Sequence, residues 1–277
     1  MSLETNPPKV AGMQRMLTTA WREIEAAIKL AWRPERDAAL GCGHYGCVFR
    51  TASPGVVCKV TTDRTEFDFV TFAMALPWPA GIVRYYAVMD LQQQYLRRPV
   101  FAVWREEANR VGEHDRNHYA YKEFQRYHGI YRHAAGYVRK HEDRLDRLPE
   151  AALITAWDTI EIDDGVPSNR IEAPLHIQRQ RGADGKAPFE RLGTPIARLA
   201  AAIRLSRISL EMMSQTAYGY TVGEALLHYL DHGMLLADVH LQNIGHVNRD
   251  GHELLVITDP GHAVLLPAKL VADSVWL

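Results

Sequence analysis

The sequence predicts an α+β protein in which a small antiparallel sheet is followed by a mainly helical region. Three observations predict this class. Short β-like runs occupy Ala39–Trp104. A charged sequence with helical periodicity extends over Arg105–His232, and two more pairs of β-like runs lie within Met234–Leu266. Apolar runs bounded by turn residues are typical of strands, whereas apolar residues at three- and four-residue steps are typical of helices.

Residues 1–37 are predicted to form an amphipathic helix that packs on the next region. Apolar residues between Met13 and Trp32 recur on one helical face, and Pro34 marks the end of that helix.

Residues 38–104 are predicted to form the sheet. A helix-like stretch, Asp63–Leu76, interrupts it and stops at Pro77. The β-like runs are Cys47–Thr51, Val56–Val60, Ile82–Met89 and Val100–Trp104.

Residues 105–277 are predicted to form a second, mainly helical lobe. The stretch from Asp163 to Gly193 is rich in Gly, Pro and Arg and interrupts the predicted helices. Near the end of the lobe, Asn248-Arg-Asp-Gly251 contains the Asp-Gly step that is typical of a two-residue β-hairpin turn.

Composition and charge exclude several classes of protein. The 277 residues are 47% hydrophobic and 23% charged, which is typical of a globular chain and not of a disordered or collagen-like one. Thirty-two basic residues against 33 acidic ones give a net charge of -1, so no membrane surface is indicated and nucleic acid is not favoured as a partner. Three cysteines, no long apolar run and no signal-peptide pattern predict a cytoplasmic protein.

A glycine-rich loop is the first motif that points to chemistry. Gly41, Gly43 and Gly46, with Val48, give the pattern G-x-G-x-x-G-x-V, which by itself also fits dinucleotide-binding turns. Here the loop leads into a second strand and not into a helix, the arrangement that folds over ATP phosphates. We therefore expect Gly41, Gly43, His44, Tyr45 and Gly46 to contact a nucleotide.

Lys59 lies in Val56-Val-Cys-Lys59, among apolar residues that make an unpaired ammonium costly. Glu66 is the predicted carboxylate partner, because on a helix it shares a face with Phe69 and Val70. Two alternatives stay open: Asp63-x-x-Glu66 is also a capping box, and Asp68 could replace Glu66 as the partner.

Three polar residues near the end of the chain match a metal-assisted phosphoryl-transfer site. Asp238 and Asn243 form D-x-x-x-x-N, and Asp259-Pro-Gly261 follows the predicted hairpin. Catalytic loops of the kinase type use this spacing: there the aspartate accepts a hydroxyl proton, and by that pattern Asn243 with Asp259 would hold Mg²⁺, which prefers oxygen ligands.

These motifs, in this order, resemble the protein-kinase-like superfamily, and the similarity is greatest to the early serine/threonine protein kinases of lytic podophages. The residues that carry the resemblance are Leu40-Gly-Cys-Gly-His44, Asp238-x-His240-x-x-Asn243-Ile244 and Ile257-Thr-Asp-Pro260. It implies a bilobal kinase-like fold that transfers phosphate from ATP-Mg²⁺ to a Ser/Thr hydroxyl. Lys59, Asp238 and His240 are the implied catalytic residues.

The resemblance also implies an adenine pocket. Val48 and Val57 would cover the base, and the backbone of the segment Trp104–Glu107, which includes Glu106, would form the hinge that binds it.

The chain departs from the family pattern in informative ways. Leu236-Ala237 replaces the usual His-Arg before the catalytic aspartate, which predicts activity without phosphorylation of an activation loop. Only 18 residues follow Asp259, so the helices that usually bind peptide substrates are expected to be missing. A protein substrate is therefore expected to dock on the helical region 105–232.

Two other functions remain open. A small-molecule kinase of the aminoglycoside or choline type would use acidic residues near Asp238, such as the cluster Asp158–Asp164. A nucleotide-binding pseudokinase would act as an inhibitor or scaffold, although retention of Lys59, Asp238, Asn243 and Asp259 argues against it.

Weaker signals have ordinary interpretations. Cys42 and Cys47 are interpreted as two small apolar residues, with a redox switch as the alternative. His114 and His118 are interpreted as part of a solvated helix face and not as a zinc site. The basic segment Arg170–Arg207 is interpreted as a loop plus an exposed helix face, with a dock for an acidic partner as the alternative.

Overall fold

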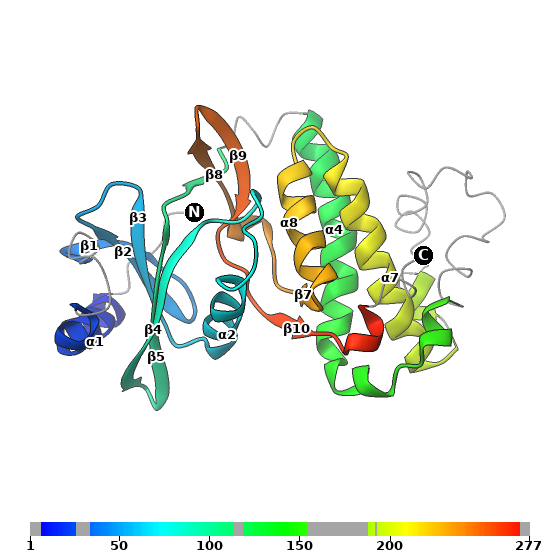
Figure 1. The fold of residues 1–277 in the computed structure, drawn as a ribbon, viewed down its shortest axis with the longest axis horizontal. Coiled ribbons are helices and arrows are strands. Elements are labelled where there is room, and N and C mark those ends of the chain that lie inside the picture. Colours follow the sequence, from blue (N-terminus) through cyan, green and yellow to red (C-terminus); the bar gives the residue numbers. More distant parts are fainter. Residues whose placement is uncertain (1–6, 26–33, 113–118, 155–187, 192, 272–277) are drawn as a thin grey trace. The chain divides into compact units, whose positions relative to one another are not determined.

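A computed structural model describes residues 7–25, 34–112, 119–154, 188–191 and 193–271 (Figure 1). It confirms the predicted α+β class: a largely antiparallel set of strands is combined with several helices. The chain divides into two compact units. Unit 1 is Met1–Trp78 with Val83–Asn109, and unit 2 is Pro79–Ile82 with Arg110–Leu277.

Unit 1 is built on a five-stranded antiparallel sheet in the order β1-β2-β3-β5-β4. The Cys47–Thr51, Val56–Val60 and Val100–Trp104 runs all lie in its strands. The elements of unit 1 are α1 (Pro7–Glu25), β1 (Pro34–Cys42), β2 (Gly46–Thr51), β3 (Val56–Thr61), α2 (Arg64–Ala73), β4 (Tyr85–Tyr95) and β5 (Arg98–Glu106). The short strand β6 (Asn109–Arg110) follows where the two units divide.

Helix α1 covers one face of this sheet. Its residues Met13, Leu17 and Ala20 are buried, and they belong to a core cluster with strand residues such as Phe49 and Trp104. A Cβ at Gly12 would collide with the ring of Tyr95 on β4, so α1 approaches the sheet closely at this glycine. The predicted amphipathic helix therefore exists, beginning at Pro7, and residues 26–33 lie outside the described residues.

Helix α2 packs on the opposite face. Phe67 lies 4.5 Å from Phe101 between ring centroids, and Phe69 contacts Tyr85 edge-on at 6.3 Å. Because side chains alternate along β5, Phe101 faces α2 while Ala102 and Trp104 face α1. The sheet is thus sandwiched between two helices, and each strand has two distinct sides.

Unit 2 is mainly helical and also contains strands of two small sheets, whose orders are β10-β7 and β6-β8-β9. Helices α4, α7 and α8 pack beside one another (Figure 1), β7 pairs with β10, and β8 pairs with β9. The described elements are α4 (Tyr119–Lys140), η2 (Glu142–Arg147), η3 (Pro188–Arg191), α7 (Pro195–Ser214), α8 (Tyr220–Asp231), β7 (Met234–Leu236), η4 (Leu241–Asn243), β8 (Ile244–Arg249), β9 (His252–Ile257), β10 (Ala263–Leu265) and η5 (Ala268–Leu270). The turn predicted between β8 and β9 is present, with positive φ at Asp250 and Gly251.

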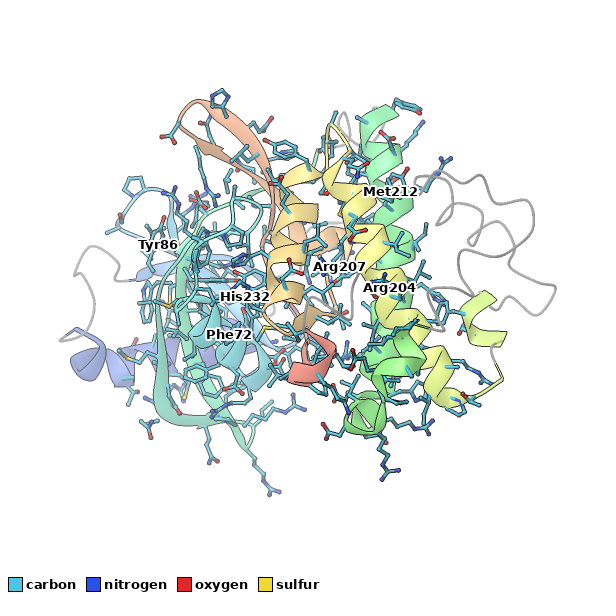
Figure 2. All side chains as sticks on the ribbon, turned by 45° about the vertical axis from the view of Figure 1, so that its right-hand side comes forward. Phe72, Tyr86, Arg204, Arg207, Met212 and His232 are labelled. Carbon is cyan, nitrogen blue, oxygen red and sulfur yellow. A yellow bond between two sulfur atoms is a disulfide. The ribbon has the colours of Figure 1, made fainter. Side chains whose placement is uncertain are left out.

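The basic segment does not form the exposed helix face that its sequence suggested. Helix α7 is buried along most of its length, and Arg204 is buried with it. Arg207, labelled in Figure 2, forms ion pairs with Glu211 at 3.1 Å and with Asp231 of α8 at 2.6 Å. These two arginines therefore serve the packing of unit 2, and residues 170–187 of the segment lie outside the described residues.

The acidic cluster Asp158–Asp164 and the His114–His118 pair also lie outside the described residues. In the part of the chain that the structure describes, no helix is both long enough and apolar enough to cross a membrane.

Candidate functional site

The glycine loop joins β1 to β2 in unit 1. The amide of Gly43 donates to the carbonyl of Gly46 at 2.9 Å, which closes the turn, and a Cβ at Gly46 would collide with the backbone of Val60. The carbonyl of Tyr45 accepts bonds from Thr62, at 2.9 Å from its amide and 3.1 Å from its hydroxyl. The loop tip is therefore fastened to the end of β3.

Cys42 and Cys47 are bonded to each other in a disulfide. Their interpretation as two separate small apolar residues is wrong. The β1–β2 register places them directly opposite each other at the base of the loop, with their Cα atoms 4.0 Å apart. Cys58 is free and buried.

Lys59 and Glu66 form a buried ion pair. The Lys59 Nζ lies 2.7 Å from the Glu66 Oε1, and the two side chains are 10% and 3% exposed. Glu66 reaches this position from the first turn of α2, which Asp63 caps by accepting the amide of Thr65 at 2.9 Å.

The structure contains neither the capping box with Glu66 nor a Lys59–Asp68 pair. In a capping box Glu66 would accept the Asp63 amide, but that amide donates to the Thr61 hydroxyl at 3.1 Å. Asp68 is exposed and pairs with Arg64 at 2.8 Å.

Val48, Val57 and Lys59 lie on the same face of the sheet. Val48 is directly opposite Lys59 across β2 and β3, and Val57 is two residues before Lys59 on its own strand. This face is the one that α2 covers in part, opposite the face covered by α1. The structure therefore brings together the predicted phosphate-holding lysine and the two predicted base-covering valines.

The predicted hinge segment, Trp104–Glu107, makes its contacts with other residues of unit 1. Trp104 is fully buried in the core cluster beneath α1. The amide of Glu106 donates to the carbonyl of Arg84 at 2.8 Å, and the amide of Glu107 donates to the carbonyl of Gly55 at 2.8 Å. Neither of these two N–H groups is left to bind an adenine base.

Unit 2 brings Asp238, Asn243 and Asp259 together. The side-chain amide of Asn243 donates to the carbonyl of Asp238 at 3.3 Å. The carbonyl of Asn243 accepts the amide of Thr258, the neighbour of Asp259, at 2.7 Å. The amide of Asn243 in turn donates to the carbonyl of His240 at 2.7 Å, so His240 belongs to the same turn.

Gly261 explains why the D-x-G motif ends in glycine. Its φ is +62°, and a Cβ there would lie 2.6 Å from the Cβ of Asp238. Its amide donates to the Asp259 Oδ1 at 3.1 Å, and the next residue, His262, accepts the amide of Ala237 at 2.8 Å. The segment carrying Asp259 is thus packed directly against the segment carrying Asp238.

These residues fit a magnesium ion by their donor chemistry. Asp259 supplies carboxylate oxygens, and the bond from the Asn243 Nδ2 to the Asp238 carbonyl leaves the Asn243 Oδ1 as the acceptor of that amide. Hard oxygen donors of this kind are the ligands that Mg²⁺ prefers.

Two buried side chains of α4 hold the Asp238 segment, and the sequence analysis did not find them. The Tyr131 hydroxyl donates to the carbonyl of Leu236 at 2.6 Å, and the His128 Nε2 donates to the carbonyl of Val239 at 2.8 Å. Burial lowers the pKa of His128 to about 4, so its ring is neutral near pH 7. Their polar atoms on an otherwise apolar helix face were the available signal.

Arg139, also on α4, is a further residue that the sequence analysis missed. Its guanidinium lies 3.4 Å from the Asp238 Oδ2, and both side chains are partly exposed, at 41% and 44%. A cation beside this carboxylate is placed to attract an anionic group that approaches Asp238.

No protein-family model matches the chain, and no curated protein matches it.

Proposed function

We propose that this chain is an ATP- and Mg²⁺-dependent phosphotransferase that acts on Ser/Thr hydroxyls of protein. The observation that carries the proposal is the buried ion pair between Lys59, on β3 of the sheet that bears the glycine loop, and Glu66, in the first turn of α2. A buried ion pair gains little stability over apolar residues of similar volume, so its presence beside such a loop calls for another role. Holding a lysine ammonium for phosphate binding is that role.

The residues of unit 1 would hold the nucleotide. Glycine-loop amides would bind phosphate oxygens, Lys59 would neutralise phosphate charge, and Glu66 would fix the lysine rotamer. Val48 and Val57 would contact the base.

The residues of unit 2 would act on the acceptor. Asp238 would orient the attacking hydroxyl and take its proton, while Asn243 and Asp259 would hold Mg²⁺, which neutralises charge on the transferred group. Catalysis of this type depends mainly on positioning and on electrostatic stabilisation. The hydrogen bonds from α4 and the contact with Gly261 give Asp238 such a fixed position.

The protein acceptor follows from the resemblance to serine/threonine kinases, and the helical region 105–232 remains its predicted docking surface. The acidic cluster that would favour a small-molecule acceptor lies outside the described residues.

The test is incubation with γ-labelled ATP and Mg²⁺ in a cell extract, beside an Asp238→Asn variant. Asp250→Asn is the matched control, because Asp250 is an exposed aspartate in the β8–β9 turn with φ +55°, a conformation that asparagine adopts readily. We expect label on protein bands from the wild type and the control, and a loss of about 10²–10⁴-fold in Asp238→Asn.

The other outcomes contradict the proposal in different ways. Label only on small solutes would indicate a small-molecule kinase. Thermal stabilisation by ATP without transfer would indicate a pseudokinase, and the absence of any response to ATP would exclude all three functions.

A further inference from the structure

Lys9, near the start of α1, contacts the backbone of the glycine loop. Its ammonium donates to the carbonyl of Gly43 at 2.6 Å and to the carbonyl of His44 at 2.8 Å. Helix α1 is anchored by its buried face and by a bond of 3.2 Å from the Gln93 side-chain Nε2 to the Met16 carbonyl, so the lysine reaches the loop from a fixed helix.

These two bonds orient the loop amides. The described peptide bonds are all trans, and in a trans peptide the N–H points away from the C=O of the same unit. Since the carbonyls of Gly43 and His44 face Lys9, the amides of His44 and Tyr45 face away from it. Among the described residues, neither amide donates a hydrogen bond.

Successive backbone N–H groups that face the same way form an anion-binding concavity. The carbonyl of Tyr45 is held by Thr62, so the loop is restrained on both sides of these two amides. The restraint comes from two different elements, α1 and the end of β3.

Positive charge supports the same interpretation. The pKa of Lys9 is lowered, first by its partial burial and then by the charge of Lys59. Two ammonium groups that repel each other are stabilised when an anion binds near both.

We propose that Lys9 is a positioning residue of the nucleotide site, and that it aims the amides of His44 and Tyr45 at the phosphates of ATP. This inference rests on the proposed function. Helix α1 is then part of the phosphate-binding apparatus and not only a cover for the sheet.

The test measures the binding of Mg-ATP and of adenosine by titration calorimetry to the wild-type chain and to Lys9→Met and Lys9→Arg. The matched control is Lys269→Met, because the Lys269 ammonium also donates to a backbone carbonyl, that of Asp146 at 2.8 Å, in unit 2. We expect Lys9→Met to weaken ATP binding about five- to tenfold and adenosine binding less than twofold. Lys9→Arg should keep most of the wild-type affinity for ATP, and Lys269→Met should leave that affinity unchanged.

Equal weakening of ATP and adenosine binding would overturn the inference, because it would show a merely structural role. Unchanged ATP binding in Lys9→Met would overturn it as well. If the wild-type chain itself binds neither ligand, the proposed function fails and the inference fails with it, which is distinguishable from a failure of Lys9 alone.

Discussion

The candidate residues of unit 1 and those of unit 2 are held in place by different means. In unit 1 a charged side chain is held by an opposite charge: Lys59 and Glu66 are buried together, 2.7 Å apart. In unit 2 Asp238 is partly exposed, and what is fixed is its backbone, through bonds to the carbonyls of Leu236 and Val239.

This difference has consequences for stability. A buried pair makes each partner necessary to the other, because removal of one leaves an uncompensated buried charge. A partly exposed aspartate on a clamped backbone can lose its charge at little cost to the fold. Under the proposed function, unit 1 therefore links phosphate binding to stability, whereas in unit 2 the proposed catalytic group can be changed without loss of stability.

The largest expected effect is that of Lys59→Met. It leaves Glu66 buried without its cation, so we expect a loss of about 3–5 kcal/mol in the free energy of unfolding, together with loss of phosphoryl transfer. Urea unfolding and the transfer assay measure the two effects.

The double variant Lys59→Met/Glu66→Leu sharpens this test. Removing both charges should restore most of the stability while transfer stays abolished. Full stability in Lys59→Met alone would show that unit 1 does not link function to stability in this way.

A smaller effect is expected from pH at His128. The unfolded chain binds the histidine proton with the ordinary pKa of 6.5, and the folded chain binds it only near pH 4. The stability that the neutral His128 gives the fold is therefore fully present above pH 6.5 and is lost as the pH falls toward 4. Between pH 7.5 and pH 5 the free energy of unfolding should fall by about 2 kcal/mol from this cause.

The measurement compares urea unfolding at these two pH values in the wild type, in His128→Gln and in a control, His252→Gln, which changes an exposed histidine of β9. His128→Gln should lose this part of the pH dependence, and the control should keep it. If both variants show the same pH dependence of the free energy of unfolding as the wild type, His128 is not its cause.

The smallest effect on stability is expected from Arg139→Ala. Its ion pair with Asp238 is partly exposed, so unfolding should change by less than about 0.5 kcal/mol. If the proposed function holds, transfer should nevertheless fall about tenfold or more, because a cation beside the proposed catalytic carboxylate is lost. Lys140→Ala, an exposed neighbour, is the control. A large loss of stability without loss of transfer would contradict the separation proposed for unit 2.

The sequence predicted the fold class well because the periodicity of apolar residues reports burial directly. The strands around Lys59 and the hairpin at Asp250-Gly251 are present, since local turn chemistry and alternation determine both. It also predicted that Glu66 would face Lys59, from the spacing of one helix face.

What the sequence could not predict depends on contacts between distant segments. Tyr131 and His128 contact carbonyls 105 and 111 residues away, and Lys9 contacts a loop 34 residues away. Local sequence can show that a polar residue lies on an apolar helix face, but it cannot show which distant carbonyl that residue contacts. The disulfide was missed for a related reason, because the alignment of Cys42 with Cys47 depends on strand register.

That disulfide gives the glycine loop an unusual topology. The segment Gly43–Gly46 closes a covalent ring whose base is the Cys42–Cys47 bond, so the tip cannot open by separation of the two strands. Cross-linking a short segment removes many of the conformations that it could otherwise adopt. A flexible loop would lose conformational entropy on binding a ligand. Here much of that entropy is already lost when the bond between the two sulfur atoms forms.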